Sequence, residues 1–294
     1  MMDFDDYLSE QVRAVDAYLD DYLPSDKAYP ESIHRAMRYS LFAGGKRLRP
    51  VLTLAAAEAV GGRQEDVMPA AAALELIHTY SLIHDDLPAM DDDSLRRGKP
   101  TSHVVFGEAI AILAGDALLT EAFNLLSGMT SGDTERWLRA VAILSEAAGV
   151  RGMVGGQVVD VESEGLPVGE DVLEYIHRNK TGALIKAAVH IGALLGGGCE
   201  EDLRRMDSYG EDLGLAFQIV DDILDIEGDA ASLGKTAGKD EKAGKATYPK
   251  IHGIEKARRR ARELSERAVD IIQPFGQAGE PLVGLARRVL SRSS

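Results

Sequence analysis

Apolar residues recur every three to four positions along most of the chain, which is the spacing of an amphipathic α-helix. The first such segment covers residues 3–23 and is followed by Pro24, which cannot continue a helix. A second covers residues 31–42 and ends before a pair of glycines. We expect further helices over residues 50–60, 69–86, 107–128, 133–149, 150–163, 170–195, 200–227, 253–272 and 280–292.

The pattern predicts an all-α protein. No segment alternates apolar and polar residues with a period of two for long, so we expect essentially no β-sheet. Short runs of turn residues separate the predicted helices, and none of them has the composition of a flexible linker. Several helices are apolar on most of their circumference and must lie at the centre of a bundle. We therefore predict a single domain over residues 1–294, although this length would also allow two.

Composition and charge exclude several classes of protein. Aromatic residues make up only 5% of the chain, which favours packing between helices over packing between sheets. A formal net charge of −15 argues against a surface for nucleic acid. The single cysteine, Cys199, excludes an internal disulfide and a cysteine-based zinc site. With an acidic N-terminal segment and no apolar run long enough to span a membrane, we expect a cytoplasmic protein.

Two clusters of aspartates, at residues 85–93 and 221–225, lie within apolar sequence. On a helix, Asp221 and Asp225 share one face because they are four residues apart. Two carboxylates about 5 Å apart repel by about 3 kcal/mol at an effective dielectric of 20, so a cation must compensate. Oxygen ligands of this kind favour Mg²⁺. A solvated helix end is the alternative for either cluster alone, and the presence of two makes that alternative the weaker one.

Basic residues gather in four short segments of this acidic chain: 46–49, 96–99, the position of Lys180, and a long irregular stretch with lysines from 235 to 245. Surface charge would explain any one of them, but Lys180 lies in apolar sequence. Arginine and lysine beside glycine turns suit phosphate groups. Acidic and basic clusters together therefore predict a polyphosphate bridged to carboxylates by Mg²⁺, next to a hydrocarbon pocket. No Walker-type motif is present, which argues against a nucleotide-binding fold.

The order and spacing of these motifs resemble the trans-isoprenyl diphosphate synthases, in particular the bacterial farnesyl diphosphate synthases, or geranyltranstransferases. Residues 85–91 resemble the first aspartate-rich motif of that family, and residues 221–225 resemble its second, Asp-Asp-x-x-Asp. Segments 44–50, 96–98 and 180–182 also match in order, as do 217–218 and 234–249. The resemblance covers essentially the whole chain and implies an all-helical bundle around a central active-site cavity, usually in a homodimer.

The resemblance also implies a role for each matching residue. The substrate isopentenyl diphosphate would be bound by Gly45, Lys46, Arg49, His78 and Arg97. The allylic diphosphate would be bound by Arg96, Lys180, Lys235 and Lys245. Three Mg²⁺ ions, or Mn²⁺ in their place, would be held by Asp85, Asp91 and Asp221, with Asp86 and Asp225 as further metal-site residues and Asp222 close by. The catalytic residues along the reacting carbons would be Lys180, Thr181 and Gln218.

The implied reaction is the head-to-tail 1'-4 condensation of isopentenyl diphosphate with dimethylallyl or geranyl diphosphate, which gives farnesyl diphosphate and diphosphate. Chain length in this family is set below the first aspartate motif, where Tyr80 is bulky and would act as a floor. The neighbouring Ser81 is small, so geranylgeranyl diphosphate, with 20 carbons, remains the alternative product.

Three other functions are weaker alternatives. A terpene cyclase or a head-to-head synthase would lack the site for isopentenyl diphosphate, which here comprises Lys46, Arg49 and Arg97. A catalytically silent partner subunit would typically lose aspartates, yet both motifs are intact. A di-iron helix bundle needs paired Glu-x-x-His motifs that face inward; Glu75 and His78 form one candidate pair, and we do not expect a di-iron centre.

Overall fold

The computed structural model describes residues 3–129, 133–227 and 246–291. The helices before the first aspartate motif are α1 (Phe4–Tyr22), α2 (Glu31–Leu41), α3 (Leu48–Ala59) and α4 (Gln64–Asp85). After it come β1 (Leu95–Arg96), β2 (Lys99–Pro100), α5 (Ser102–Phe106), α6 (Glu108–Ser127), α7 (Thr134–Ala148), α8 (Met153–Glu162) and α9 (Glu170–Ile176). A π-helix, η1 (His177–Gly182), leads into α10 (Ala183–Leu195) and α11 (Glu200–Glu227). The last elements are α14 (Tyr248–His252), α15 (Ile254–Ile272), the 3₁₀ segment η2 (Gln273–Gly279) and α16 (Glu280–Leu290).

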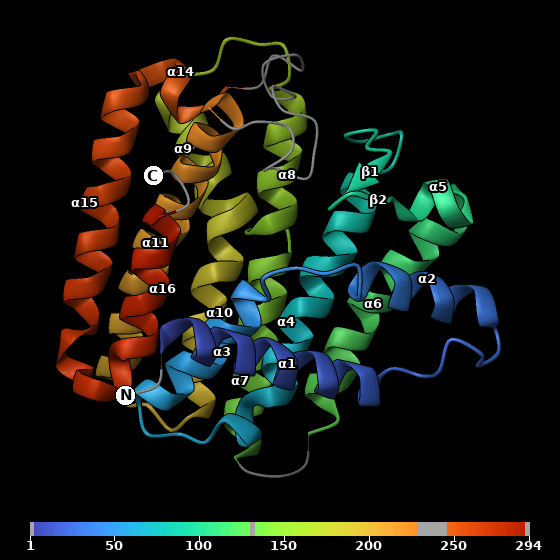
Figure 1. Ribbon diagram of the computed structural model, residues 1–294, viewed down its shortest axis with the longest axis horizontal. Helices are drawn as coiled ribbons and strands as arrows, with labels where there is room; N and C mark the ends of the chain where they lie inside the picture. Colours follow the sequence, from blue (N-terminus) through green and yellow to red (C-terminus); the bar gives the residue numbers. More distant parts are fainter. Residues whose placement is uncertain (1–2, 130–132, 228–245, 292–294) are drawn as a thin grey trace.

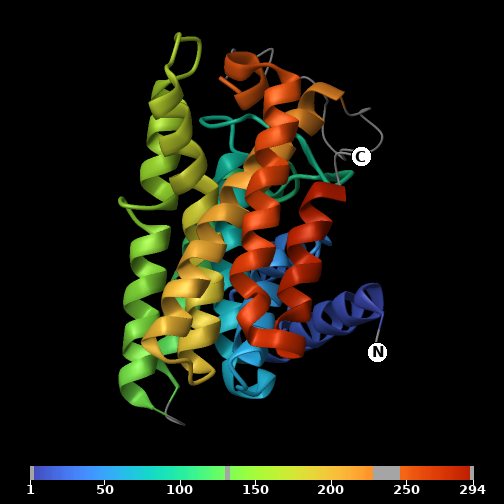
Figure 2. The ribbon, with the colours of Figure 1, turned by 90° about the vertical axis from the view of Figure 1, so that its left-hand side faces the viewer.

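The central helices of the bundle are α3, α4, α10 and α11. Helix α10 packs between α3 and α11, while α4 packs on α3 and α6, and α15 covers α11. These helices are apolar around most of their surface: nine of the twelve residues of α3 are buried. The buried side chains form one continuous cluster that draws on helices from α1 to α16. Helices α4, α11 and α15 stand upright in Figure 1, whereas α1 lies across them, and α7 and α8 follow one another along one edge in Figure 2. The expected all-α fold is confirmed.

The expected absence of sheet holds for the described residues except for one short hairpin. Strands β1 and β2 pair Leu95 with Pro100 and Arg96 with Lys99. The two residues between them, Arg97 and Gly98, both have positive φ angles, of 52° and 75°. This is the signature of a type I′ turn, the two-residue loop that matches the twist of paired strands. Two paired residues a strand are too few to show as alternation in the sequence.

Two helix predictions need correction. The predicted helix over 69–86 begins five residues earlier, at Gln64, because Val67 is fully buried and acidic residues in the first turn suit the helix dipole. Pro69 lies inside this helix, past its first turn, where the missing N–H costs one backbone hydrogen bond. The predicted continuous helix over 170–195 is divided by the π-helix η1. Short α5 and the lone turn of α14 were not predicted as helices.

Helix α6 is unusual for its apolar surface. Among the described helices it is the one with the length and composition to cross a membrane, with a mean hydropathy of 1.6 in its most apolar window. A buried core helix passes the same test, and 39% of that window is buried in the bundle. Its outward face keeps Ile112 and Leu113 exposed, beside exposed Val104 and Val105 of α5.

Candidate active site

The first aspartate motif is folded back on the end of α4. Asp85 is the last residue of the helix, and its carbonyl oxygen accepts the N–H of Asp91 at 2.8 Å. The N–H of Asp93 donates in turn to the carbonyl oxygen of Asp86 at 3.1 Å. Burial raises the pKa of Asp85 to about 6; Lys180 opposes this shift and Asp91 adds to it. The loop thus brings Asp91 near Asp85, and the end of α4 faces Lys180 of the π-helix.

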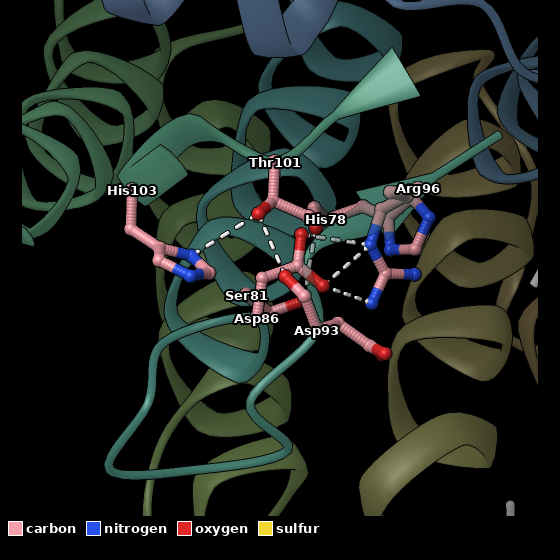
Figure 3. A network of polar contacts seen from close by, with 7 residues as sticks. All are labelled: His78, Ser81, Asp86, Asp93, Arg96, Thr101 and His103. Carbon is pink, nitrogen blue, oxygen red and sulfur yellow. Dashed lines mark hydrogen bonds and ion pairs between the residues drawn. The ribbon is translucent and has the colours of Figure 1, made fainter. Parts of the chain in front are cut away.

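Asp86 is turned away from this pair and holds an arginine of the hairpin. Its buried carboxylate accepts two hydrogen bonds from Nε of Arg96, at 2.8 and 3.0 Å, and one from Nη2 at 2.6 Å. Figure 3 shows this fork, with Thr101 beside it. The hydroxyl of Thr101 donates to the carbonyl oxygen of Asp93 at 2.7 Å, which ties β2 to the aspartate loop. The residues predicted for metal and for phosphate are therefore partners of one another here.

A basic pocket surrounds His78 on the neighbouring turn of α4. Burial lowers the pKa of His78 well below its usual value, and Arg49, Arg97 and Arg96 lower it further. Burial also lowers the pKa of Arg49 to about 10, and its Nε has no hydrogen-bond partner among the described residues. Arg49 and Arg96 are half-buried and Arg97 is exposed, and guanidinium groups gathered this closely favour an anion between them. Four of the residues predicted for isopentenyl diphosphate lie at this pocket: Gly45, Arg49, His78 and Arg97.

Gly45 and Arg97 depend on each other. A Cβ atom at Gly45 would lie 2.4 Å from Nη1 of Arg97, and the φ angle of 138° at Gly45 is one that favours glycine. The positive φ angle of Arg97 in the hairpin turn brings its guanidinium over this glycine. Lys46, the next residue, is exposed. Gly45 is thus needed for the close approach of an arginine.

Arg47 lies in the same basic motif as Lys46 and Arg49, but its contacts differ from theirs. It is 3% exposed, and its guanidinium donates to Asp16 at 2.7 Å, to Glu75 at 2.8 Å and to the carbonyl oxygen of Leu41 at 2.7 Å. These contacts join α1, the end of α2 and α4 to the start of α3. Arg47 is therefore a structural clamp, and it leaves Arg49 to face the basic pocket.

The π-helix carries the predicted catalytic residues Lys180 and Thr181. Nζ of Lys180 donates to Asp160 of α8 at 2.7 Å, and the hydroxyl of Thr181 donates to Oε1 of Gln218 at 2.8 Å. The backbones approach closely on both sides: a Cβ atom at Gly156 would lie 2.2 Å from the backbone nitrogen of Lys180. A π-helix is rare and is frequently found at functional sites. The structure thus brings α8, η1 and α11 together around these residues.

Two polar residues of α8 were not predicted as site residues. Asp160 pairs with Lys180, and the side-chain oxygen and nitrogen of Gln157 are both buried without a partner among the described residues. The two residues are three apart and therefore share a helix face. The signal that could have found them is the Gly-Gln-x-x-Asp spacing at 156–160, two polar residues on one face of an otherwise apolar segment.

The second aspartate motif lies on α11, near its C-terminal end. Asp221 and Asp225 share one face of this helix, as predicted, and both are half-buried. Asp222, on another face, is 4% exposed and bonds to Gln218 and to the start of α14. The hairpin after α4 and helix α14 lie at the same end of the bundle in Figure 1. The predicted ligands Lys235 and Lys245 lie outside the described residues.

The two predicted chain-length residues have different surroundings. Ser81 is half-buried, lies one turn before Asp85, and donates its hydroxyl to the carbonyl oxygen of His78 at 2.9 Å. Tyr80 is 6% exposed, and its ring meets that of His84 edge to face at 5.8 Å. Burial raises the pKa of Tyr80 to about 12, and Asp85 adds to this shift. Tyr80 is thus buried beside the aspartate that ends its helix.

The carboxylates of the first motif have the chemistry of a site for a divalent cation. Asp85 and Asp91 disfavour each other's charge, and a hard cation would relieve that repulsion. Among the described residues, no three acidic, histidine or cysteine side chains lie close enough together to hold a metal by themselves.

Comparison with known proteins supports the resemblance. Residues 30–274 match the Polyprenyl synthetase family. The chain is 50% identical to heterodimeric geranylgeranyl pyrophosphate synthase large subunit 1 of Arabidopsis thaliana, covering 99% of this chain and 80% of that protein. It is also 50% identical to a dimethylallyltranstransferase of Fischerella ambigua, covering 98% and 83%. Its fold matches the FPP/GFPP synthase of Zymomonas mobilis with a TM-score of 0.89 at 37% identity, covering 97% and 98%. The chain therefore belongs to the polyprenyl synthetase family of trans-isoprenyl diphosphate synthases, prenyltransferases that elongate a prenyl chain head to tail.

Proposed function

We propose that the protein condenses isopentenyl diphosphate with dimethylallyl and then geranyl diphosphate, and that it needs Mg²⁺ to do so. The observation that carries the proposal is the meeting of a half-buried carboxylate pair, Asp85 and Asp91, with Lys180 of the π-helix, next to the basic pocket at His78. Carboxylates for a cation and guanidinium groups for a second anion suit two diphosphate substrates held side by side.

The residues around the site suit each step of such a condensation. The Arg49 and Arg97 guanidinium groups hold the diphosphate of isopentenyl diphosphate, and Lys180 neutralises the departing diphosphate of the allylic substrate. Thr181 and Gln218 stabilise the allylic cation with their oxygen atoms, and the buried helices exclude water that would capture it. Mg²⁺ held by Asp85, Asp91 and Asp221 supplies further stabilisation of negative charge on the allylic diphosphate.

Product length is the finer part of the proposal. Our first candidate is farnesyl diphosphate, because buried Tyr80 beside the end of α4 provides a bulky floor. The second candidate is geranylgeranyl diphosphate. Ser81, which is small and half-buried one turn before Asp85, favours it, as does 50% identity to a relative named for that product.

Product analysis tests both parts. The purified protein is incubated with isopentenyl diphosphate, Mg²⁺ and each of dimethylallyl, geranyl and farnesyl diphosphate, and the dephosphorylated products are separated by length. A C15 alcohol from the two shorter starters supports Tyr80 as the floor. A C20 alcohol supports passage at Ser81, and Ser81→Phe should then shorten the product. Full activity in excess EDTA would contradict the need for a divalent cation.

We also propose that the protein forms a homodimer through α5 and α6. Val104, Val105, Ile112 and Leu113 of these helices are between 42% and 53% exposed. Adjacent exposed apolar side chains of this size typically mark a surface that another protein covers. A second copy of the chain is the occupant that the family resemblance implies.

A further inference from the structure

Asp222 is the meeting point of three elements. Its Oδ1 accepts a hydrogen bond from Nε2 of Gln218 at 3.0 Å, and its Oδ2 accepts the backbone N–H of Tyr248 at 2.8 Å. Nε2 of His177 lies 3.2 Å from the same Oδ2. Asp222 and His177 are each 4% exposed. Both oxygens of this carboxylate are thus engaged inside the protein, by α11, by the first residue of α14 and by the first residue of the π-helix.

These contacts determine which way the neighbouring amide and hydroxyl point. Because a carboxylate can only accept, Gln218 must present its NH₂ group to Asp222. Its Oε1 is then directed at Thr181, whose hydroxyl donates to it at 2.8 Å. The single proton of the Thr181 hydroxyl is used in this bond, so only lone pairs remain for another partner. A carbocation beside the Thr181 hydroxyl would then face the lone pairs of its oxygen. If the hydroxyl were turned the other way, its proton would point at the cation.

We propose that Asp222 and His177 are positioning residues for the condensation, which act through Gln218 to keep the Thr181 hydroxyl oriented with its lone pairs toward the reacting carbons. This inference rests on the proposed function. Asp222 sets the direction of the hydrogen-bond chain. His177 gives the π-helix a second attachment to the same carboxylate, four residues before Thr181. The role of Asp222 is therefore distinct from that of Asp221 and Asp225, which lie on another face of α11.

Asp222→Asn tests the direction of the chain. The asparagine can accept the N–H of Tyr248 with its oxygen only by presenting its NH₂ group to Gln218. That reverses the Gln218 amide and forces Thr181 to accept. We expect kcat to fall about 100-fold, the size of effect that misoriented groups produce, with the KM of isopentenyl diphosphate and the helical circular dichroism unchanged. Asp171→Asn, at an exposed aspartate of α9, is the matched control.

A double-mutant cycle separates positioning from metal binding. In a Thr181→Val background no hydroxyl remains to be misoriented, so adding Asp222→Asn should cost less than about threefold in kcat. An undiminished loss in that background would overturn the proposal. A higher Mg²⁺ concentration for half-maximal activity in Asp222→Asn would also overturn it, by making Asp222 a metal residue.

His177 is tested by a conservative rescue. His177→Phe keeps the ring volume without the nitrogen and should lower kcat, while His177→Gln, whose Nε2 can reach the same carboxylate, should restore most of it. Equal losses in both variants would contradict a role through Asp222.

The side-chain NH₂ signals of Gln218 in a ¹⁵N spectrum give a readout independent of turnover. The chemical shifts of these signals should change in Asp222→Asn, and unchanged shifts would contradict the positioning role. The absence of any prenyl product from the wild-type protein would refute the proposed function alone.

Discussion

At the scale of single residues, Asp85 shows that the site is built at a cost to stability. Burial raises its pKa from 3.8 to about 6. A group with a raised pKa binds a proton more tightly in the folded protein, so its ionisation destabilises the fold as the pH rises from about 4 to 6. Asp85→Asn removes this penalty and should stabilise the metal-free protein at pH 7.5 by up to about 3 kcal/mol. The gain should fade towards pH 4.

Urea unfolding of both proteins in EDTA at pH 4.5 and 7.5 measures this difference. Activity of Asp85→Asn should be lost, because its amide cannot bind a divalent cation as a carboxylate does. If Asp85→Asn were less stable than the parent at pH 7.5, ionisation of Asp85 would not be costing the folded protein stability.

Arg47 carries the opposite prediction, because its charge is compensated in the core. Arg47→Met leaves Glu75, which is 2% exposed, without its partner and should destabilise the protein by about 3–5 kcal/mol. Adding Glu75→Gln should recover much of that loss, because an uncharged amide is cheaper to bury than an unpaired carboxylate. Chemical denaturation checks both variants. Arg63→Ala, which removes an exposed ion pair, is the control, and an equal loss there would contradict the argument.

Arg47 also shows the limit of sequence analysis at this scale. The segment Gly-Gly-Lys-Arg-Leu-Arg identifies a cluster of cations, but it does not tell which arginine faces substrate. That depends on the positive φ angle of 47° at Arg47, which sends its side chain into the core. The contacts of Asp86 could not be predicted either, because its hydrogen bonds to Arg96 depend on a hairpin turn that no periodic pattern in the sequence indicates.

At the scale of elements, most helices follow from periodicity, while the π-helix does not. Each of α9 and α10 keeps the apolar spacing of a helix, so the pattern over 170–195 reads as continuous. The wider turn of the π-helix between them changes the direction in which its side chains point. The amino-acid composition of this segment does not mark the change. Buried contacts with α8 and α11, which are distant in sequence, stabilise this local geometry. No local pattern carries that information.

The π-helix leads to a prediction about register. Deleting Asn179 would let α9 run into α10 as an uninterrupted α-helix, with Lys180 rotated by about 100° from its present direction. We expect a folded, helical protein with turnover reduced at least about 100-fold, since Lys180 would lose its contact with Asp160. Circular dichroism and product formation are the measurements. The control Asn179→Ala keeps the register and should retain activity. If the deletion variant also retained activity, the π-helix would be dispensable.

At the scale of the whole molecule, an acidic chain concentrates its cations where anionic substrates would bind. The net charge of −15 repels such substrates at long range, so the basic pocket of Arg49, Arg96 and Arg97 must attract them at short range. The core is one continuous cluster, and apolar side chains that it does not cover gather on α5 and α6. Helix α8 also exposes Val154, Val158 and Val161, so the interface that we propose on α5 and α6 has to be tested by experiment.

That surface gives the last prediction. Leu113 is 51% exposed on α6, whereas Leu166 is 58% exposed in the connection between α8 and α9. Replacing either with glutamate adds one negative charge to a side chain of similar exposure, so general repulsion affects both variants equally. If α6 is the interface, Leu113→Glu should give a monomer in sedimentation equilibrium at concentrations where the parent protein and Leu166→Glu are dimers. Burying an unpaired carboxylate at a dimer interface costs several kcal/mol, enough to shift this equilibrium by a factor of 100 or more. A dimer that survives Leu113→Glu would place the interface on another face of the bundle.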